Sequence, residues 1–182
     1  MAASAAKDSS RIDQLLKANS VFAQTWPTPP TMVQMRAASE GGILVLTCMD
    51  PRVVPEQFFP NARIAVFRNA GGRYSPDVVR TAATLRKLMG DKPGAVTTVI
   101  VVHHTDCGMT HLTNKEIQDD IVAKFPAEAE TAKAINFGCF TGEDLVKSIK
   151  EDVEALKAEE ILKGIEIVGF ALDTVTGLLS AV

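Results

Sequence analysis

The feature that most constrains the fold of this chain is an alternation of short apolar runs with longer helical patterns. Each run is rich in β-branched residues and is too short to form a buried helix. Apolar strands that alternate with helices are typical of a mainly parallel sheet whose two faces are covered. The sequence therefore predicts an α/β fold with a central, mostly parallel β-sheet flanked by helices. The predicted strands are Ile43–Leu46, Ile64–Phe67, Val96–Val102 and Ile165–Leu172.

Helical patterns fill the segments between these strands. Ser75 or Asp77 can cap a helix that runs to about Met89, where Gly90 and Pro93 end it. Nearer the C-terminus, apolar residues at helical spacing form one stripe of another long helix. The predicted helices are residues 10–23, 75–89, 114–125 and 142–160, and residues 175–182 are predicted as a short edge strand.

A cluster of proline and threonine at residues 25–31 separates the first predicted helix from the rest of the chain. We expect residues 1–31 to form an N-terminal helical arm and residues 32–182 to form a single α/β domain. The first helix is amphipathic. The sequence leaves open whether its apolar residues pack on a neighbouring subunit or on the arm's own domain.

Charge and hydropathy exclude several classes of partner. The 182 residues carry 19 basic and 22 acidic side chains, a net charge of −3, so no basic field recruits nucleic acid or an anionic membrane. No apolar run approaches the roughly 18–20 residues that span a bilayer. The N-terminal residues lack the apolar stretch of a signal peptide. We therefore expect a cytoplasmic protein with no membrane or nucleic-acid partner, whose three cysteines are reduced thiols.

Residues with unusual chemistry follow two of the predicted strands. Cys48, Asp50 and Arg52 come after the first strand, and His104 and Cys107 come after the third. The carboxyl ends of parallel strands meet at one edge of a sheet, where ligand sites of α/β folds collect. The sequence therefore predicts that these five side chains form one site.

The two cysteines and the histidine suit a soft divalent metal, and zinc is the usual occupant of a mixed sulfur and nitrogen set. Three protein ligands leave a fourth tetrahedral position for water, as in catalytic zinc sites. Period-two spacing in an extended chain would point Cys48, Asp50 and Arg52 the same way, so that Asp50 and Arg52 could pair beside the metal. Three other interpretations stay open: cysteines that only pack in the core, a structural zinc site completed by Cys139, and a nucleophilic cysteine with His104 as its base.

The pair of motifs resembles a known family. Cys48-x-Asp50-x-Arg52 and His104-x-x-Cys107-Gly108 are similar to the two zinc-binding motifs of β-class carbonic anhydrases. The resemblance extends to residues 53–56 and to residues 68–71, and it covers most of residues 40–172. The residues of the two motifs are most similar to those of a short-chain branch of that family, which also includes carbonyl sulfide and carbon disulfide hydrolases.

This resemblance implies a site and an activity. Cys48, His104 and Cys107 would be the zinc ligands, and Asp50 and Arg52 would be the catalytic dyad. The implied reaction is hydration of carbon dioxide to bicarbonate by a zinc-bound hydroxide. A carbonyl sulfide hydrolase, which would release hydrogen sulfide and carbon dioxide by the same attack, is the alternative. A structural zinc or thiol-redox binding module is a more distant alternative. The family also implies a homodimer or a homotetramer.

Two departures from the family pattern concern the pocket. Some members carry a substrate-binding glutamine just before the first strand, where this chain has only residues 37–40, with Gln34 farther off. Gly71 and Gly72 replace the bulkier residues that often follow the second strand. The choice between carbon dioxide and carbonyl sulfide should then depend on pocket width and lining. The candidate lining residues, each also an ordinary core residue, are Phe58, Phe59, Phe67, Tyr74, Met109 and Leu112.

The ligand charges predict a pH dependence. A zinc ion held by imidazoles alone lowers the pKa of its bound water to about 7. Two thiolates cancel the charge of the ion, so the water should be less acidic here. We therefore expect the activity to rise with an ionisation above neutral pH.

Overall fold

The computed structural model describes residues 2–37, 41–89 and 96–182, and the chain divides into two compact units, residues 1–37 and 38–182. The first unit contains helix α1, Ala2–Phe22, and a short helix α2, Met32–Ala37. Helix α1 begins earlier than the predicted residue 10, because its alanine-rich start has high helix propensity. Every side chain from residue 11 to residue 37 is exposed in the structure. No helix among the described residues is both long enough and apolar enough to cross a membrane.

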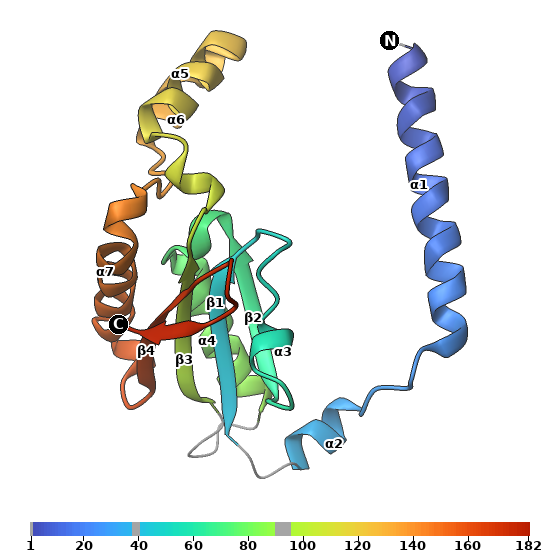
Figure 1. Ribbon diagram of the computed structural model, residues 1–182, viewed down its shortest axis with the longest axis vertical. Helices are drawn as coiled ribbons and strands as arrows, with labels where there is room; N and C mark the ends of the chain where they lie inside the picture. Colours follow the sequence, from blue (N-terminus) through green and yellow to red (C-terminus); the bar gives the residue numbers. More distant parts are fainter. Residues whose placement is uncertain (1, 38–40, 90–95) are drawn as a thin grey trace. The chain divides into compact units, whose positions relative to one another are not determined.

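The second unit is built on a five-stranded sheet with the order β2-β1-β3-β4-β5 (Figure 1). The first four strands are parallel, and β5 pairs antiparallel with β4 at the edge. This confirms the predicted α/β fold and its mostly parallel sheet. The strands are β1 Gly42–Cys48, β2 Ile64–Asn69, β3 Val96–His104, β4 Glu166–Leu172 and β5 Leu179–Ala181.

The two faces of the sheet bury separate apolar clusters. Alternate residues of the central strands, such as Leu44 and Val99, pack on one face with the two long helices α4, Pro76–Leu88, and α7, Leu145–Lys157. Their neighbours pack on the other face with the short helix α3, Pro55–Phe58.

Helix α7 approaches the sheet closely because β4 has a glycine beneath it. A Cβ at Gly169 would lie 2.4 Å from Ile149 Cγ2, closer than a side chain tolerates. The close contact fixes α7 against β4, and α7 also contacts β3.

Two further helices, α5 Asn114–Lys124 and α6 Ala129–Ala134, follow β3 and precede α7 in the chain, and they pack against each other. Helix α5 begins with a capping box formed by Thr113 and Glu116. The short helices α2, α3 and α6 were not predicted, because four to six residues are too few to show a period of 3.6.

Candidate metal centre

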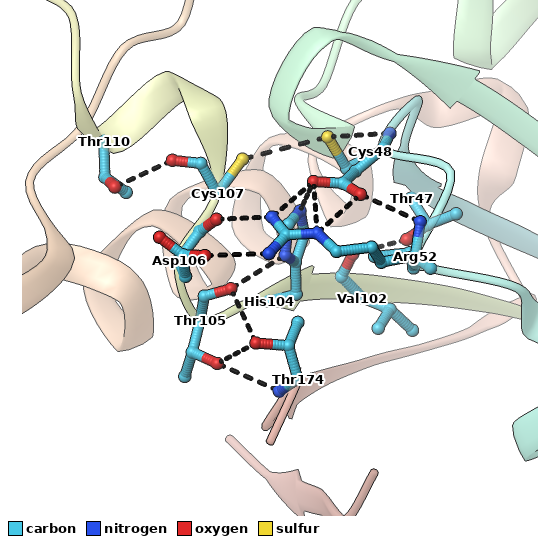
Figure 2. A network of polar contacts seen from close by, with 12 residues as sticks. Thr47, Cys48, Arg52, Val102, His104, Thr105, Asp106, Cys107, Thr110 and Thr174 are labelled. Atoms are coloured by element: carbon cyan, nitrogen blue, oxygen red, sulfur yellow. Dashed lines mark hydrogen bonds and ion pairs between the residues drawn. The ribbon is translucent and has the colours of Figure 1, made fainter. Parts of the chain in front are cut away.

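Two cysteines and one histidine meet at the carboxyl edge of the sheet. Cys48 ends β1, His104 ends the neighbouring strand β3, and Cys107 follows three residues later. All three side chains are buried, and their ligand atoms lie within 4.8 Å of one another. The sulfur atoms of Cys48 and Cys107 face each other (Figure 2), and they lie 3.8 Å apart. The sheet therefore brings together the three predicted ligands.

The spacing and the hydrogen bonds of this group fit a zinc ion. Two sulfurs at the usual Zn–S distance around a tetrahedral ion are about 3.8 Å apart, as here, whereas a disulfide would need about 2.05 Å. His104 Nδ1 donates to the carbonyl oxygen of Thr105 at 2.9 Å, which leaves a lone pair on Nε2. That Nε2 atom is buried, and it has no hydrogen-bond partner among the described residues. A metal ion would give this nitrogen the partner it lacks.

A tight turn carries the chain from His104 to Cys107. Asp106 lies in the left-handed region with φ 52°, a conformation that aspartate adopts more readily than most residues. The Thr105 amide donates to the Leu172 carbonyl, and the Thr110 amide and hydroxyl donate to the Cys107 carbonyl. These bonds let one short segment present two ligands to the same point.

The carbonyl that orients His104 is itself held by the loop after β4. Thr174 Oγ1 donates to the Thr105 carbonyl oxygen at 3.3 Å, and the Thr174 amide donates to Thr105 Oγ1 at 3.0 Å. Thr174 therefore supports the ring of His104 through Thr105 (Figure 2). The sequence carries no motif that would have pointed to this residue.

Two glycines lie against Cys48. Gly72 has φ 71°, and a Cβ there would lie 2.9 Å from the backbone nitrogen of Cys48 and from the Thr47 carbonyl carbon. Gly71 has φ 78° and is less constrained, since its Cβ would meet only the side chains of Arg73 and Met109. Gly72 thus lets this loop pass directly against the first ligand.

The two thiols share their hydrogen bonding unequally. A hydrogen bond from Cys107 lowers the pKa of Cys48 well below its usual range, in spite of burial, and His104 and the backbone amides of Asp50 and Gly71 act in the same direction. The same contact with Cys48, together with burial, raises the pKa of Cys107. Burial lowers the pKa of His104, but its contacts with Cys48, with the Thr105 backbone and with the Asp50 charge together raise that pKa overall. The group therefore readily provides a first thiolate for a cation.

Asp50 and Arg52 form a bidentate pair beside the ligands. Arg52 Nε lies 3.0 Å from Asp50 Oδ1, and Arg52 Nη2 lies 2.7 Å from Asp50 Oδ2. The predicted extended exit from β1 is wrong: Asp50 opens a turn in which its carbonyl accepts from the Val53 amide and its carboxylate accepts from the Arg52 amide. The turn brings the two side chains together more directly than an extended segment would.

The carboxylate of Asp50 is next to the metal ligands. Asp50 Oδ2 lies 3.9 Å from His104 Nε2, and the side chain is only 13% exposed. Hydrogen bonds from Arg52 lower the pKa of Asp50 to about 2. Asp50 is therefore an ionised acceptor at neutral pH.

Arg52 also links the two ligand-bearing loops. Its Nη1 donates to Asp106 Oδ2 at 2.8 Å, and its Nη2 donates to the Asp106 carbonyl oxygen at 2.8 Å. On the outer side, His111 Nε2 lies 3.1 Å from Asp106 Oδ1, and His111 is exposed. The sequence suggested a hydrogen bond from Asp106 within its loop, but it did not predict these contacts with Arg52.

The six candidate lining residues lie in different places. Met109 packs with Cys48 and Cys107 in one apolar cluster. Phe58 and Phe59 pack on the α3 face of the sheet, and Phe67 and Tyr74 pack on the α4 and α7 face, where the Tyr74 hydroxyl donates to Glu159. Leu112 is 47% exposed.

The segment before α7 contributes apolar side chains that the sequence did not point to. Phe137, Cys139 and Phe140 pack against the cluster formed by Cys48, Cys107 and Met109. Cys139 is half-buried, and it does not belong to the group of close ligand atoms in the described structure. This segment, together with Met109, gives the centre an apolar side.

His103 points away from the metal centre, as the alternation of side chains along β3 requires. It is fully buried, with Nδ1 2.8 Å from Ser148 Oγ and Nε2 3.1 Å from Asp152 Oδ2. Its Nε2 also lies 3.2 Å from the carbonyl oxygen of Gly72, to which it donates. His103 thus connects α7 to the loop that supports Cys48.

Comparisons with known proteins agree with this geometry. The family described as carbonic anhydrase matches residues 43–179. A carbon disulfide hydrolase from Acidianus sp. (strain A1-3) is 37% identical over 133 residues, which cover 68% of this chain and 62% of that protein. This chain therefore spans less than two thirds of that relative's length. Beta-carbonic anhydrase 1 of Mycobacterium tuberculosis (strain ATCC 25618 / H37Rv) is 27% identical over 143 residues, 77% of this chain and 81% of that protein.

Solved structures share the fold. A carbonic anhydrase from Streptococcus mutans superposes with a TM-score of 0.76 at 28% identity, covering 94% of this chain and 96% of that chain. The apo form of a carbon disulfide hydrolase superposes with a TM-score of 0.64 at 25% identity, covering 94% of this chain and 90% of that chain.

Proposed function

Because the chain belongs to the β-carbonic anhydrase family, we propose that it is a zinc enzyme that hydrates carbon dioxide to bicarbonate. The observation that carries the proposal is the ionised Asp50, held by Arg52 beside Cys48, His104 and Cys107. A structural metal site would need no carboxylate of this kind next to an incomplete set of ligands.

The residues present assign roles to the groups around the reaction. Zinc, when bound by the two cysteines and His104, supplies a Lewis acid that lowers the pKa of a water molecule. Asp50 accepts a hydrogen bond from the attacking water and aims its lone pair at the substrate carbon. Arg52 keeps this carboxylate ionised and holds it in position. The apolar side formed by Met109, Phe137 and Phe140 favours a small, linear, uncharged substrate.

Hydrolysis of a sulfur analogue, carbonyl sulfide or carbon disulfide, is the second candidate. Two observations favour it: the 37% identity to a carbon disulfide hydrolase, and the apolar cluster around the centre, which offers sulfur atoms favourable dispersion contacts. The same attack on the substrate carbon would serve both reactions.

Paired assays on one zinc-loaded preparation test the proposal. Carbon dioxide hydration is measured by the change of a pH indicator, and hydrogen sulfide release is measured from carbonyl sulfide and from carbon disulfide. We expect hydration to have the highest kcat/KM. A higher kcat/KM for a sulfur compound would make hydrolysis the main activity, and the absence of all three activities would contradict both candidates.

We propose that the protein assembles as a homodimer or a homotetramer. The support is the set of apolar side chains that the N-terminal unit exposes, including Leu15, Leu16, Phe22 and Trp26. Side chains of this size are usually covered in a stable protein, and a second copy of the chain would cover them.

A further inference from the structure

Asp106 contacts Arg52 at two points. Arg52 lies between two aspartates, with Nε and Nη2 directed at Asp50 and with Nη1 and Nη2 directed at the Asp106 carboxylate and carbonyl. Figure 2 shows the guanidinium of Arg52 directed at Asp106. Asp106 therefore satisfies the guanidinium edge that Asp50 does not use.

These contacts of Asp106 with Arg52 matter because the Arg52 side chain is 49% exposed. A long exposed arginine samples many rotamers, and a single exposed ion pair holds it only weakly. Contacts with two aspartates at 2.7–3.0 Å restrict the guanidinium to one plane. Asp50 meets a donor that is already in place.

We propose that Asp106 is a positioning residue, which holds the Arg52 guanidinium and, through it, the Asp50 carboxylate beside the metal ligands. The proposal rests on the proposed function, since it concerns the carboxylate that orients the attacking water. Asp106 itself does not touch the ligand atoms: its side chain is directed at Arg52 and His111. Without it, Asp50 would lose a fixed partner and could occupy the position that the water needs.

A second role of Asp106 must be separated from this one. With φ 52°, Asp106 also shapes the turn that joins His104 to Cys107. Glycine suits this conformation, asparagine tolerates it, and alanine is strained there. The two roles therefore predict different orders of activity for the same three substitutions.

The experiment compares D106G, D106N and D106A in the full-length, zinc-loaded protein. If Asp106 anchors Arg52, the glycine and alanine variants both lose about tenfold in kcat/KM, and the asparagine variant, whose amide oxygen still accepts from Arg52, is partly rescued. If Asp106 only shapes the turn, the glycine variant is as active as the wild type and the alanine variant alone is impaired. That second result would overturn the proposal.

Two readouts besides activity accompany the series. The cobalt-loaded variants are compared by visible absorption, which reports the ligands of the metal, and the zinc-loaded D106G variant is crystallised. We expect D106G to change the spectrum and to show Asp50 displaced from Arg52. An unchanged spectrum, with Asp50 and Arg52 paired as before, would contradict the anchor even if the wild type proved inactive on every substrate.

The matched control is H111A. His111 is the other partner of Asp106, and its removal leaves both Arg52 contacts in place. We expect wild-type kcat/KM and a wild-type cobalt spectrum. A loss equal to that of D106G would mean that Asp106 acts through His111, contrary to the proposal.

Discussion

At the scale of single residues, the orientation of His104 depends on a carbonyl oxygen that two other groups share. The Thr105 carbonyl accepts from His104 Nδ1 and from Thr174 Oγ1. Fixing this carbonyl keeps the proton on Nδ1, so Nε2 faces Cys48 and Cys107 as a free lone pair. We therefore expect Thr174, far along the chain, to contribute to the affinity for a metal without touching it.

We predict that T174V weakens zinc binding by about tenfold, because the carbonyl that orients His104 loses a donor. The measurement is a competition titration with a zinc chelator. T84V, which removes an exposed hydroxyl that donates to the Arg80 carbonyl of its own helix, is the control and should bind zinc like the wild type. Equal affinities for T174V and the wild type would contradict the proposed support.

R52A tests the role of the dyad directly. Asp50 loses the partner that holds it, while the three ligands are untouched. We expect full zinc content, a loss of about a hundredfold in kcat/KM, and Asp50 on the metal in a crystal structure. A metal position still open to water in this variant would count against the idea that Arg52 holds Asp50 away.

The pH dependence of the reaction follows from the charges. The folded-state pKa of Asp50, about 2, lies below its usual value, so its ion pair contributes to stability above about pH 4 and is lost only as the pH falls towards 2. The ionisation of Asp50 should therefore cause no change in kcat/KM between about pH 5 and 9. We expect kcat/KM to rise with one ionisation above neutral pH, measured by stopped flow. A flat profile from acid through neutral pH would refute this.

At the scale of elements, the loop after β2, residues 70–72, has little freedom to change. Gly72 combines a left-handed backbone with close approach to the backbone of Thr47 and Cys48, which cannot move without displacing a ligand. The fold at this point depends on the absence of a side chain.

We predict that G72A lowers the free energy of unfolding by about 2 kcal/mol or more, through strain and the backbone clash. Urea unfolding of the zinc-loaded protein measures this. G142A is the control, because its Cβ would meet nothing within 4 Å and its φ is not positive. G142A should unfold close to the wild type, and a similar stability for G72A would show that the loop can move aside.

The strands, and the meeting of Cys48, His104 and Cys107 at one edge of the sheet, could be predicted from the sequence because each leaves a local pattern. A β-branched run such as Val99–Val102 marks a buried strand, and a histidine and a cysteine at its end mark a site. The contacts of Asp106 and Thr174 leave no such pattern, since each depends on how two loops meet in space. The apolar contribution of Phe137 and Phe140 was missed for the same reason: their segment has no regular period.

At the scale of the whole molecule, the two units differ in how they bury their side chains. The second unit, residues 38–182, has an apolar cluster on each face of its sheet, whereas the N-terminal unit has no buried side chain among its described residues 11–37. A unit of this kind contributes to stability only through what it packs against.

We predict that deletion of residues 1–31 leaves the second unit folded and able to bind zinc but reduces the number of chains in the assembly. Light scattering after size-exclusion chromatography gives the mass, and circular dichroism reports the fold. The full-length chain is the control. An unchanged number of chains would assign the interface to the second unit. A truncated chain that unfolds would show that the arm covers its own domain.

The pairing of β1 with β3 has a consequence for how the protein matures. Cys48 and Cys107 are 59 residues apart in the chain, and they meet only because two parallel strands lie side by side. Closing such a long loop and pairing these strands must come before the third ligand is in place. His104 and Cys107 can meet early as a weak two-ligand site, and Cys48 completes it last. We therefore expect a metal ion to bind late in folding, after β1 and β3 have paired, and then to stabilise the pairing of these central strands.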